Sequence, residues 1–563
     1  MRVSYPRTPH LPWSPGAAAD DLRSGDLSGL AGAEVVVTEK LDGENTTLYP
    51  DGLHARSPDS GHHPSRAWVK GLQGRIGAGV PAGWRICGEN LFARHSLAYT
   101  DLDSWFYGFS VWTAEDRCLD WDATVRFLGR LGVPTPRVLW RGRYEERAIR
   151  ALKLDPERQE GYVVRTVAGF DRAEFGRRVA KWVRPHHVRT DTHWMHAAVV
   201  ENGLGPNSAL WHVRSGGEPD AAGLGAALGL PLLPELDDVT ARLDALGRTG
   251  DARLAGVLAH GLRTARRAEL MPRLAGPLGL RQARRVADLV GLYPRLGQPF
   301  PDEERRAGLT GLAAAADLGV LHAVAAAALP GDEQVAWSAL HAEDAGLLGP
   351  DPLARLRAGL REALADLDPD VRDRCWAQAR EAYARGRIST VEEAVAASWA
   401  RRDGRFPRLV HLCGPSGSGK STYAATLPGT RISLDDLRAA RGSRAEQRDN
   451  PELLREGLTT LEAALAGDGT AVWDATSLNR HQRGHVHGIA ERRGALLTQV
   501  VAVVDEAELL RRNAVRPHPV PAEVLTAQLH RWNPPYPGQA HRTRYLGADG
   551  TVQDTAGSLD EED

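Results

Sequence analysis

A glycine-rich segment, GPSGSGKS at residues 414–421, constrains the fold of this chain more than any other feature of the sequence. It fits the pattern GxxxxGK followed by Ser or Thr, a phosphate-binding loop that connects a β-strand to an α-helix. The apolar run RLVHLC precedes the segment and TYAATL follows it, as that context requires. Strand and helix patterns then alternate to about residue 545, so residues 401–547 are predicted to form an α/β domain.

The loop has the residue types that hold the phosphates of a nucleotide. Its glycines let the backbone wrap close to the phosphates, and successive N–H groups with the helix N-terminus form a cradle. Lys420 is expected to reach the outer phosphates, and the Ser421 hydroxyl is expected to help hold Mg²⁺. The nucleotide-binding residues predicted here are Gly414, Gly417, Gly419, Lys420, Ser421 and Thr422.

Three later features narrow the chemistry. Asp435 follows a second predicted strand, TRISL, where a carboxylate can accept the proton of a substrate hydroxyl, and Arg438 can hold a nearby substrate phosphate. A third predicted strand ends at Asp474. Arg512 and Arg516 lie on a later basic helix, which either neutralises triphosphate charge as a lid or is a solvated face.

The order of these features resembles the kinase domain of the polynucleotide kinase family, which phosphorylates 5′-OH ends of RNA or DNA. The resemblance spans about residues 405–545. It implies that Asp435 is the general base and that Arg438 contacts the phosphate flanking the 5′-OH. It also implies a metal-binding carboxylate at Asp474 and a lid arginine at Arg512 or Arg516. The implied cofactors are ATP or another nucleoside triphosphate, with Mg²⁺ or Mn²⁺.

The N-terminal part of the chain has a different pattern, with short β-rich runs separated by Gly, Pro and Asp. Lys40 ends one such run, in EVVVTEKLDGEN, and is one of only five lysines in a chain with 70 Lys and Arg residues. Lysines that persist in an Arg-rich chain are enriched where Arg chemistry fails, as at a nucleophile. To attack the α-phosphorus of ATP, Lys40 must be neutral, so we expect neighbouring cations and a bound metal to lower its pKa.

Further candidate residues follow Lys40 in order. Glu89 comes after a predicted strand and suits a ribose hydroxyl, and the aromatic run WFYGF offers a ring that can stack on adenine. Glu160 offers a metal-binding carboxylate, and Lys181 offers a cation for the α-phosphate. Each motif alone also fits an ordinary strand and turn, so the interpretation depends on their order.

This ordered set resembles the covalent nucleotidyltransferase superfamily and, within it, the RNA ligases. The resemblance implies an α+β nucleotidyltransferase domain over residues 1–215, with KLDGEN, WFYGF, EGYVVR and KWVR as its motifs I, III, IV and V. It implies that Phe106 is the adenine-stacking ring. Residues implied in the nucleotide or end-sealing step are Asn45, Arg56 and Glu89.

Two residues depart from the family pattern. Val179 stands where motif V often has a first lysine, so only Lys181 is carried over, and Ser110 stands where motif III usually ends in Asp. DNA ligases and mRNA capping enzymes normally place a β-rich domain just after motif V, whereas this chain soon becomes Ala-rich helix. That difference favours an RNA ligase.

Residues 216–400 have Ala, Leu and Arg at helical spacing and are predicted to form an all-α middle domain. Scaffolding is its simplest role. The alternative is an HD-like fold. It would be degenerate, because the adjacent His and Asp that an active site of that type needs occur nowhere in the chain. The arginine runs at residues 263–267 and 281–285 either line an RNA path or form solvated helix faces. The acidic residues 548–563 are expected to be a disordered tail.

Composition sets the outer limits. With a net charge of −2, overall charge gives no argument for a nucleic-acid partner. The chain has no run of about 18 apolar residues and no signal-peptide pattern, and its four cysteines are scattered. We therefore expect a cytoplasmic protein without a membrane span.

These expectations combine into a multidomain RNA end-healing and sealing enzyme, an ATP-dependent RNA ligase working through lysyl-AMP joined to a 5′-OH polynucleotide kinase. Its expected partners are RNAs with 5′-OH or 5′-phosphate and 3′-OH ends, broken tRNA among them. One alternative is a DNA end-repair kinase-ligase. Another is an RNA-damage sensor with a P-loop nucleotide switch, although a pure switch needs no hydroxyl base such as Asp435. The sequence leaves open the oligomeric state, a dimer included, and the removal of 3′ or cyclic phosphates.

Overall fold

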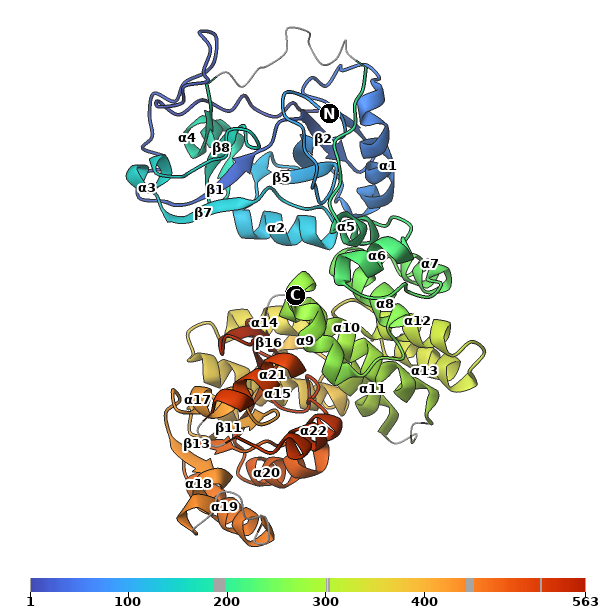
Figure 1. Ribbon diagram of the computed structural model, residues 1–563, viewed down its shortest axis with the longest axis vertical. Coiled ribbons are helices and arrows are strands. Elements are labelled where there is room, and N and C mark those ends of the chain that lie inside the picture. The colour runs from blue at the N-terminus through green and yellow to red at the C-terminus, as the bar shows by residue number, and fades with distance from the viewer. Residues whose placement is uncertain are drawn as a thin grey trace. The chain divides into compact units, whose positions relative to one another are not determined.

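The computed structural model describes residues 2–185, 198–299, 301, 304–441, 450–516 and 519–561. The chain divides into two compact units, Met1–Leu254 and Ala255–Asp563 (Figure 1). Along the chain the fold class predicted from the sequence is confirmed: a sheet-rich part comes first, a helical region follows, and an α/β sheet domain comes last.

The first unit contains two antiparallel sheets. One has the strand order β10-β8-β1-β7, and its strands are β1 (Glu34–Lys40), β7 (Val138–Arg143), β8 (Gly161–Thr166) and β10 (Val179–Val183). The other has the order β3-β2-β4-β5-β6-β9, with β2 (Glu44–Tyr49), β3 (Gly52–His54), β4 (Arg85–Asn90), β5 (Phe106–Trp112), β6 (Arg117–Cys118) and β9 (Phe170–Asp171).

The turn between β1 and β2 carries the chain from one sheet to the other. Gly43 lies in this turn, and a Cβ at this position would lie only 2.5 Å from the carbonyl oxygen of Asn90. Only glycine therefore fits here without a backbone shift. Along β1 the side chains alternate, with Val35 and Val37 in an apolar core. Lys40, three residues after Val37 on the strand, consequently faces the other side.

Helices complete the first unit. Helix α1 (Ala67–Ile76) and α2 (Trp121–Arg130) pack their apolar residues on the six-stranded sheet. Shorter or later helices are α3 (Glu146–Arg150), α4 (Phe175–Arg178), α5 (Ser208–Arg214), α6 (Ala221–Leu228) and α7 (Asp237–Ala245). Helix α8 (Gly250–Gly261) contains the boundary between the two units, which follows Leu254. Arg253 on α8 is 1% exposed and donates to the carbonyl oxygens of Val213 and Gly217 at 2.6 and 2.9 Å. This buried guanidinium holds the helices after β10 together.

The second unit contains a six-stranded sheet of order β12-β13-β11-β14-β15-β16, parallel except for the antiparallel pair β15 and β16. Its strands are β11 (Arg408–Cys413), β12 (Thr430–Ser433), β13 (Thr470–Asp474), β14 (Leu496–Ala502), β15 (Arg542–Leu546) and β16 (Val552–Ala556). The helices between these strands are α17 (Lys420–Ala424), α18 (Leu434–Ala440), α19 (Asn450–Ala464), α20 (Arg480–Arg492), α21 (Glu506–Val515) and α22 (Ala522–Arg531).

The helical region precedes this sheet in the chain and belongs to the same unit. Its helices are α9 (Arg267–Leu278), α10 (Leu280–Leu292), α11 (Arg305–Ala313), α12 (Leu318–Ala328), α13 (Glu333–Asp344), α14 (Ala354–Ala363), α15 (Pro369–Ala384) and α16 (Val391–Ala397). In the parts of the chain that the structure describes, no single helix is long and apolar enough to cross a membrane. The bent pair α11 and α12 passes that test by length and composition only, and Leu318–Ala325 of α12 is buried within the protein.

The expectation of a disordered acidic tail at residues 548–563 is wrong for the described part of that segment. Strand β16 pairs with β15, and Leu559 is fully buried in a core formed with helices of the middle region. The acidic residues are not all solvated, because Asp554 pairs with the buried guanidinium of Arg284, 2.5 Å from its Nε. The acidic composition alone suggested disorder. It could not reveal the ordering contact, because the partner of Asp554 lies 270 residues earlier in the chain.

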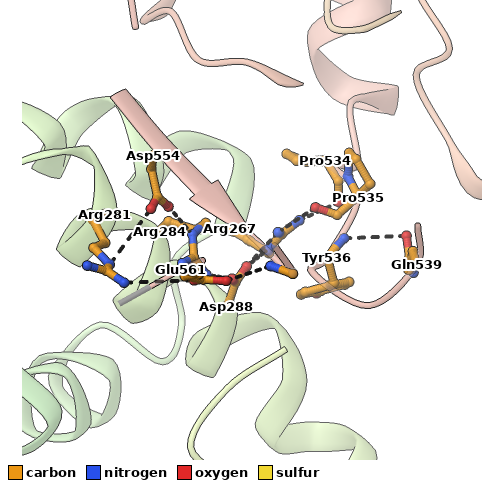
Figure 2. Close-up of polar contacts among 11 residues, drawn as sticks. Arg267, Arg281, Arg284, Asp288, Pro534, Pro535, Tyr536, Gln539, Asp554 and Glu561 are labelled. Atoms are coloured by element: carbon orange, nitrogen blue, oxygen red, sulfur yellow. Dashed lines mark hydrogen bonds and ion pairs between the residues drawn. The ribbon is translucent and has the colours of Figure 1, made fainter. Parts of the chain in front are cut away.

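A buried ion network links the helical region to the α/β sheet domain (Figure 2). Asp288 on α10 is fully buried and accepts hydrogen bonds from Arg267 on α9, at 2.8 Å from its Nε, and from Arg284, at 3.2 Å from its Nη1. Arg267 also donates to the carbonyl oxygens of Pro534 and Pro535 after α22. The two expectations for these arginine runs, an RNA path or a solvated face, are therefore both wrong for Arg267 and Arg284.

We expect Asp288→Ala to lower the free energy of unfolding of the second unit by about 3–5 kcal/mol, because it leaves two buried guanidinium groups without their shared carboxylate. The control is Glu269→Ala, which removes the exposed partner of Arg266 on α9 and is expected to cost under about 1 kcal/mol. Urea denaturation of the three proteins measures the difference. Equal midpoints for the two variants would contradict the central role of the network.

Candidate active sites

A cavity of about 660 Å³ lies in the first unit and is lined by residues of both sheets. This volume is typical of a small-molecule or nucleotide site. Its lining includes Lys40 at the end of β1, Glu89 on β4, Phe109 on β5 and Lys181 on β10. Candidate residues that are far apart in the sequence therefore come together around one space.

Lys40 is held at this cavity by a short ion pair. Its Nζ lies 2.5 Å from a carboxylate oxygen of Glu160, and the two side chains are 22% and 8% exposed. The pairing follows from the sheet, because Lys40 on β1 lies opposite Gly161 on β8 and Glu160 is the residue just before that strand. The antiparallel register thus brings together two predicted site residues that are 120 positions apart.

Acidic groups, rather than cations, dominate the electrostatics around Lys40. Burial alone would lower the pKa of Lys40, but the charges of Glu160, Glu89 and Asp42 outweigh it and raise the pKa above its ordinary value. Burial and the neighbouring carboxylates raise the pKa of Glu89 to about 8. The expectation that neighbouring cations lower the pKa of Lys40 is therefore wrong for the protein's own side chains.

The charge of Lys40 acts on a second lysine of the cavity, Lys181. Burial, followed by the charge of Lys40, lowers the pKa of Lys181. Arg56 and Asn45 also line the cavity. The carboxamide oxygen of Asn45 is buried and has no hydrogen-bond partner among the described residues, so it can accept a hydrogen bond from a ligand.

The second site is the glycine-rich loop between β11 and α17. Gly414, Gly417 and Gly419 have φ angles of 151°, 83° and 89°, which side chains other than glycine rarely adopt. Lys420 donates to the carbonyl oxygen of Pro415 at 2.7 Å. Its burial lowers its pKa to about 8, and the charges of nearby carboxylates offset this only in part. The loop thus has the backbone shape of a phosphate cradle, with the lysine folded back onto it.

The candidate metal ligands of this site are in direct contact. The Ser421 hydroxyl, on the first turn of α17 beside Thr422, donates to Asp474 Oδ1 at 3.1 Å. The other oxygen of Asp474 lies 2.5 Å from Arg431 Nη2. A hydroxyl and a carboxylate at this spacing fit Mg²⁺, which binds few protein oxygens and completes its shell with phosphates and water.

Asp435 and Arg438 lie at the same edge of the sheet. Ser433, the last residue of β12, is opposite Asp474 of β13, and Asp435 follows it on the first turn of α18. The Asp435 carboxylate is 68% exposed and forms an ion pair with Arg438 one turn later. The structure therefore places the candidate hydroxyl base beside the candidate metal ligand, at the end of the sheet where the glycine-rich loop begins.

The two candidate lid arginines lie on α21 and just after it. Arg512 donates to Glu508 at 2.7 Å and to the carbonyl oxygen of Ala548 at 2.6 Å. Its Nη1 lies 3.9 Å from the point that a Cβ on Gly419 would occupy, so it is close to the loop. The charge of Arg516 contributes to the low pKa of Lys420. Both arginines therefore lie near the glycine-rich loop.

Two segments of the chain match known family models. Residues 33–183 match the RNA ligase family model, and residues 409–535 match an AAA domain model. The chain carries an RNA ligase domain and a P-loop domain. No curated protein matches the chain.

Among solved structures, a gluconokinase from Sinorhizobium meliloti is 22% identical, with a TM-score of 0.20, and the match covers 26% of this chain and 84% of that one. An archaeal ATP-dependent RNA ligase is 17% identical, with a TM-score of 0.24 and coverage of 32% and 48%. A Naegleria gruberi RNA ligase mutant with ATP and Mn is 17% identical, with a TM-score of 0.23 and coverage of 32% and 61%. The chain thus spans about half of the archaeal ligase.

The prediction that Phe106 is the adenine-stacking ring is wrong. Phe106 is fully buried in the core between the six-stranded sheet and helices α1 and α2, and it does not line the cavity. The register of β5 on β4 shifts by one residue, so that Cys87 pairs with Ser110 but Gly88 pairs with Gly108. Phe109 is the extra residue at this bulge and lines the cavity instead. Strand alternation read from the sequence could not reveal the shift.

The sequence also missed cavity residues that precede the first motif. Tyr5, Pro6, Arg7 and Thr8 line the cavity of the ligase domain, and so does His95. No motif marks residues 5–8, because they lie before the first predicted strand, and His95 lies between two of the predicted motifs. In the helical region, His322 is buried and contacts Leu318 O at 2.8 Å and Ser338 Oγ at 3.1 Å.

We expect Phe109→Ala to weaken ATP binding to the ligase cavity about tenfold, since the stacking of one base on an aromatic ring is worth about 1–3 kcal/mol. Phe106→Leu should leave ATP affinity unchanged, because its ring faces the core. Calorimetric titration in a Lys420→Ala background removes the contribution of the P-loop. Loss of affinity in Phe106→Leu alone would restore the original assignment.

Proposed function

We propose that this protein is a bifunctional RNA end-healing and sealing enzyme, an ATP-dependent RNA ligase and a polynucleotide 5′-OH kinase on one chain. The proposal is supported by two different candidate nucleotide sites on one chain. One has Lys40 at a cavity of nucleotide size, and the other has a P-loop with the candidate hydroxyl base Asp435 at the same sheet edge.

In the ligase reaction Lys40 is the nucleophile. Its nitrogen forms a bond to the α-phosphorus of ATP while the bond from that phosphorus to the leaving pyrophosphate breaks, and the amine releases its protons to water. Glu160 orients the lysine through the 2.5 Å contact, and Lys181 faces the α-phosphate. AMP then passes from Lys40 to the 5′-phosphate of the RNA, and the 3′-OH of the other end displaces AMP.

In the kinase reaction Asp435 takes the proton of the 5′-OH, whose oxygen bonds to the γ-phosphorus as ADP leaves. The P-loop amides and Lys420 hold the outer phosphates. Arg438, which forms an ion pair with Asp435, holds the phosphate that flanks the 5′-OH. Arg512 and Arg516 neutralise charge on the transferring group.

Both reactions call for a divalent cation, and the residues present fit one. Ser421 and Asp474 would hold Mg²⁺ or Mn²⁺ in the P-loop domain, and Glu160 would hold it in the ligase domain. In the ligase domain the carboxylates of Glu160, Glu89 and Asp42 raise the pKa of Lys40 despite its burial, which indicates local negative charge that a cation would offset. Such a cation supplies charge neutralisation for the phosphates.

Incubation with α-labelled ATP tests the ligase. We expect a covalent protein–AMP adduct that is lost in Lys40→Ala and retained in Lys420→Ala, because the two lysines serve different sites. Lys153→Ala, which changes an exposed lysine of the same domain, is the matched control and should retain the adduct. Absence of the adduct from the unaltered protein would sink the ligase assignment.

Incubation of a 5′-OH oligonucleotide with γ-labelled ATP tests the kinase. We expect the label to appear on the 5′ end and to fall at least about 100-fold in Asp435→Asn, since loss of a general base typically costs this much. Asp468→Asn, at an exposed site, is the matched control. Hydrolysis of ATP without any label on the oligonucleotide would favour a nucleotide switch instead.

The nucleic-acid class is tested by comparing nicked RNA, nicked DNA and broken tRNA-like loops in both assays. We expect RNA to be joined faster than DNA. Faster joining of nicked DNA would favour the DNA end-repair alternative. A cytoplasmic location is part of the proposal, and the four cysteines, all buried free thiols, are consistent with a reducing compartment.

A further inference from the structure

A segment before the matched ligase residues contributes to the ligase cavity. We call residues 5–14 the N-terminal arm. The RNA ligase model begins at residue 33, so the arm lies outside it. Four consecutive arm residues, Tyr5, Pro6, Arg7 and Thr8, nevertheless line the cavity.

The arm is fixed to the strand that presents Lys181. The carbonyl oxygen of Pro9 accepts from the Lys181 N–H at 2.9 Å, and the Leu11 N–H donates to the Lys181 carbonyl oxygen at 2.7 Å. Ser14 Oγ accepts from the Val183 N–H at 2.9 Å. The arm thus runs parallel to β10 and occupies its hydrogen-bonding edge. Two bonds to one residue fix the backbone of the arm relative to the Lys181 side chain.

The arm also contacts the ring at the apolar end of the cavity. Tyr5 packs edge-to-face on Phe109, with ring centroids 5.2 Å apart, and on Phe175 at the same distance. Aromatic pairs of this geometry hold both rings in place. The arm therefore supports two features of the site, the candidate adenine-stacking ring and the candidate phosphate-binding lysine.

Arg7 lies between these two anchors, two residues before Pro9 and two after Tyr5. Its side chain is 52% exposed, and Asp21 is its ion-pair partner at 3.9 Å. Asp21 also lies 3.4 Å from His10 of the arm. An exposed pair at this distance contributes little, so Arg7 can turn to a stronger anion. Arg7 is one of six Lys and Arg residues that line the cavity, with Lys40, Arg56, Arg66, Arg165 and Lys181.

We propose that Arg7, positioned by the N-terminal arm, binds the β- and γ-phosphates of ATP in the ligase cavity and the pyrophosphate that departs from them. The inference rests on the proposed ligase function. When the Lys40 nitrogen bonds to the α-phosphorus, the oxygen of the breaking bond takes the electron pair, and negative charge builds on the pyrophosphate. A guanidinium matches that charge and can bind two phosphate oxygens at once. Its position at the exposed rim gives the pyrophosphate a path to solvent.

The test is Arg7→Ala in three assays. We expect the KM for ATP in lysyl-AMP formation to rise roughly tenfold, and the pyrophosphate concentration that reverses a purified lysyl-AMP protein to rise by a similar factor. Sealing of pre-adenylated RNA should be unchanged, because no pyrophosphate takes part in that step. Arg7→Lys keeps the charge without the planar fork. Its KM for ATP and its pyrophosphate requirement should lie between those of the unaltered protein and Arg7→Ala.

Arg23→Ala is the matched control, since Arg23 is an exposed arginine of the same N-terminal segment that does not line the cavity. Unaltered values for ATP and pyrophosphate in Arg7→Ala would overturn the inference while the ligase assignment stands. Slower sealing of pre-adenylated RNA in Arg7→Ala would also overturn it, because Arg7 would then contact the RNA. A native protein that forms no lysyl-AMP overturns the ligase function and this inference together.

Discussion

The second unit is organised around one buried charge, the carboxylate of Asp288. This side chain has no contact with solvent, and its two guanidinium partners are 5–6% exposed. Removal of Asp288 would leave two buried guanidinium groups without the carboxylate they share, which is far more costly than loss of a surface pair. The network therefore commits distant parts of the chain to one arrangement. Arg284 reaches Asp554 on the last strand, and Arg267 reaches the carbonyl groups after α22.

The commitment extends to the P-loop. Helix α22 ends just before the prolines that Arg267 holds, and Gln528 on this helix accepts a hydrogen bond from the Ser416 N–H of the P-loop at 2.8 Å. The exposed Arg266 donates to the carbonyl oxygens of Leu529 and His530 at 3.3 and 3.0 Å. Helix α9 of the middle region thus holds one end of a helix that contacts the phosphate cradle. These hydrogen bonds are the physical basis of a scaffold role for the middle helices.

What could be predicted from the sequence was local. The P-loop and the strand ends of Lys40 and Asp435 have patterns within a few residues, and periodicity distinguishes the sheet-rich, helical and α/β parts. The failures required information from elsewhere in the chain. Phe106 was misassigned because a one-residue register shift against β4 reverses the side-chain order of β5. The tail was misread because Asp554 pairs with Arg284, 270 positions away.

Arginine and lysine have different roles in this protein because their side chains differ in hydrogen-bonding geometry and in how readily they lose a proton. Buried arginines such as Arg253 and Arg267 each satisfy several fixed carboxylate and carbonyl oxygens, which suits a planar fork with five donors. The lysines at the two sites have environments that only a ligand would balance. Lys420 is buried, which lowers its pKa to about 8, and phosphate charge beside it would raise that pKa again. Lys40 faces an excess of carboxylates that raises its pKa. Burial thus favours the neutral form of Lys420, whose proposed role needs a cation, and carboxylates favour the charged form of Lys40, whose proposed role needs a neutral amine. Phosphates beside Lys420 and a cation beside the carboxylates of Lys40 would shift each pKa toward the form that its proposed chemistry requires.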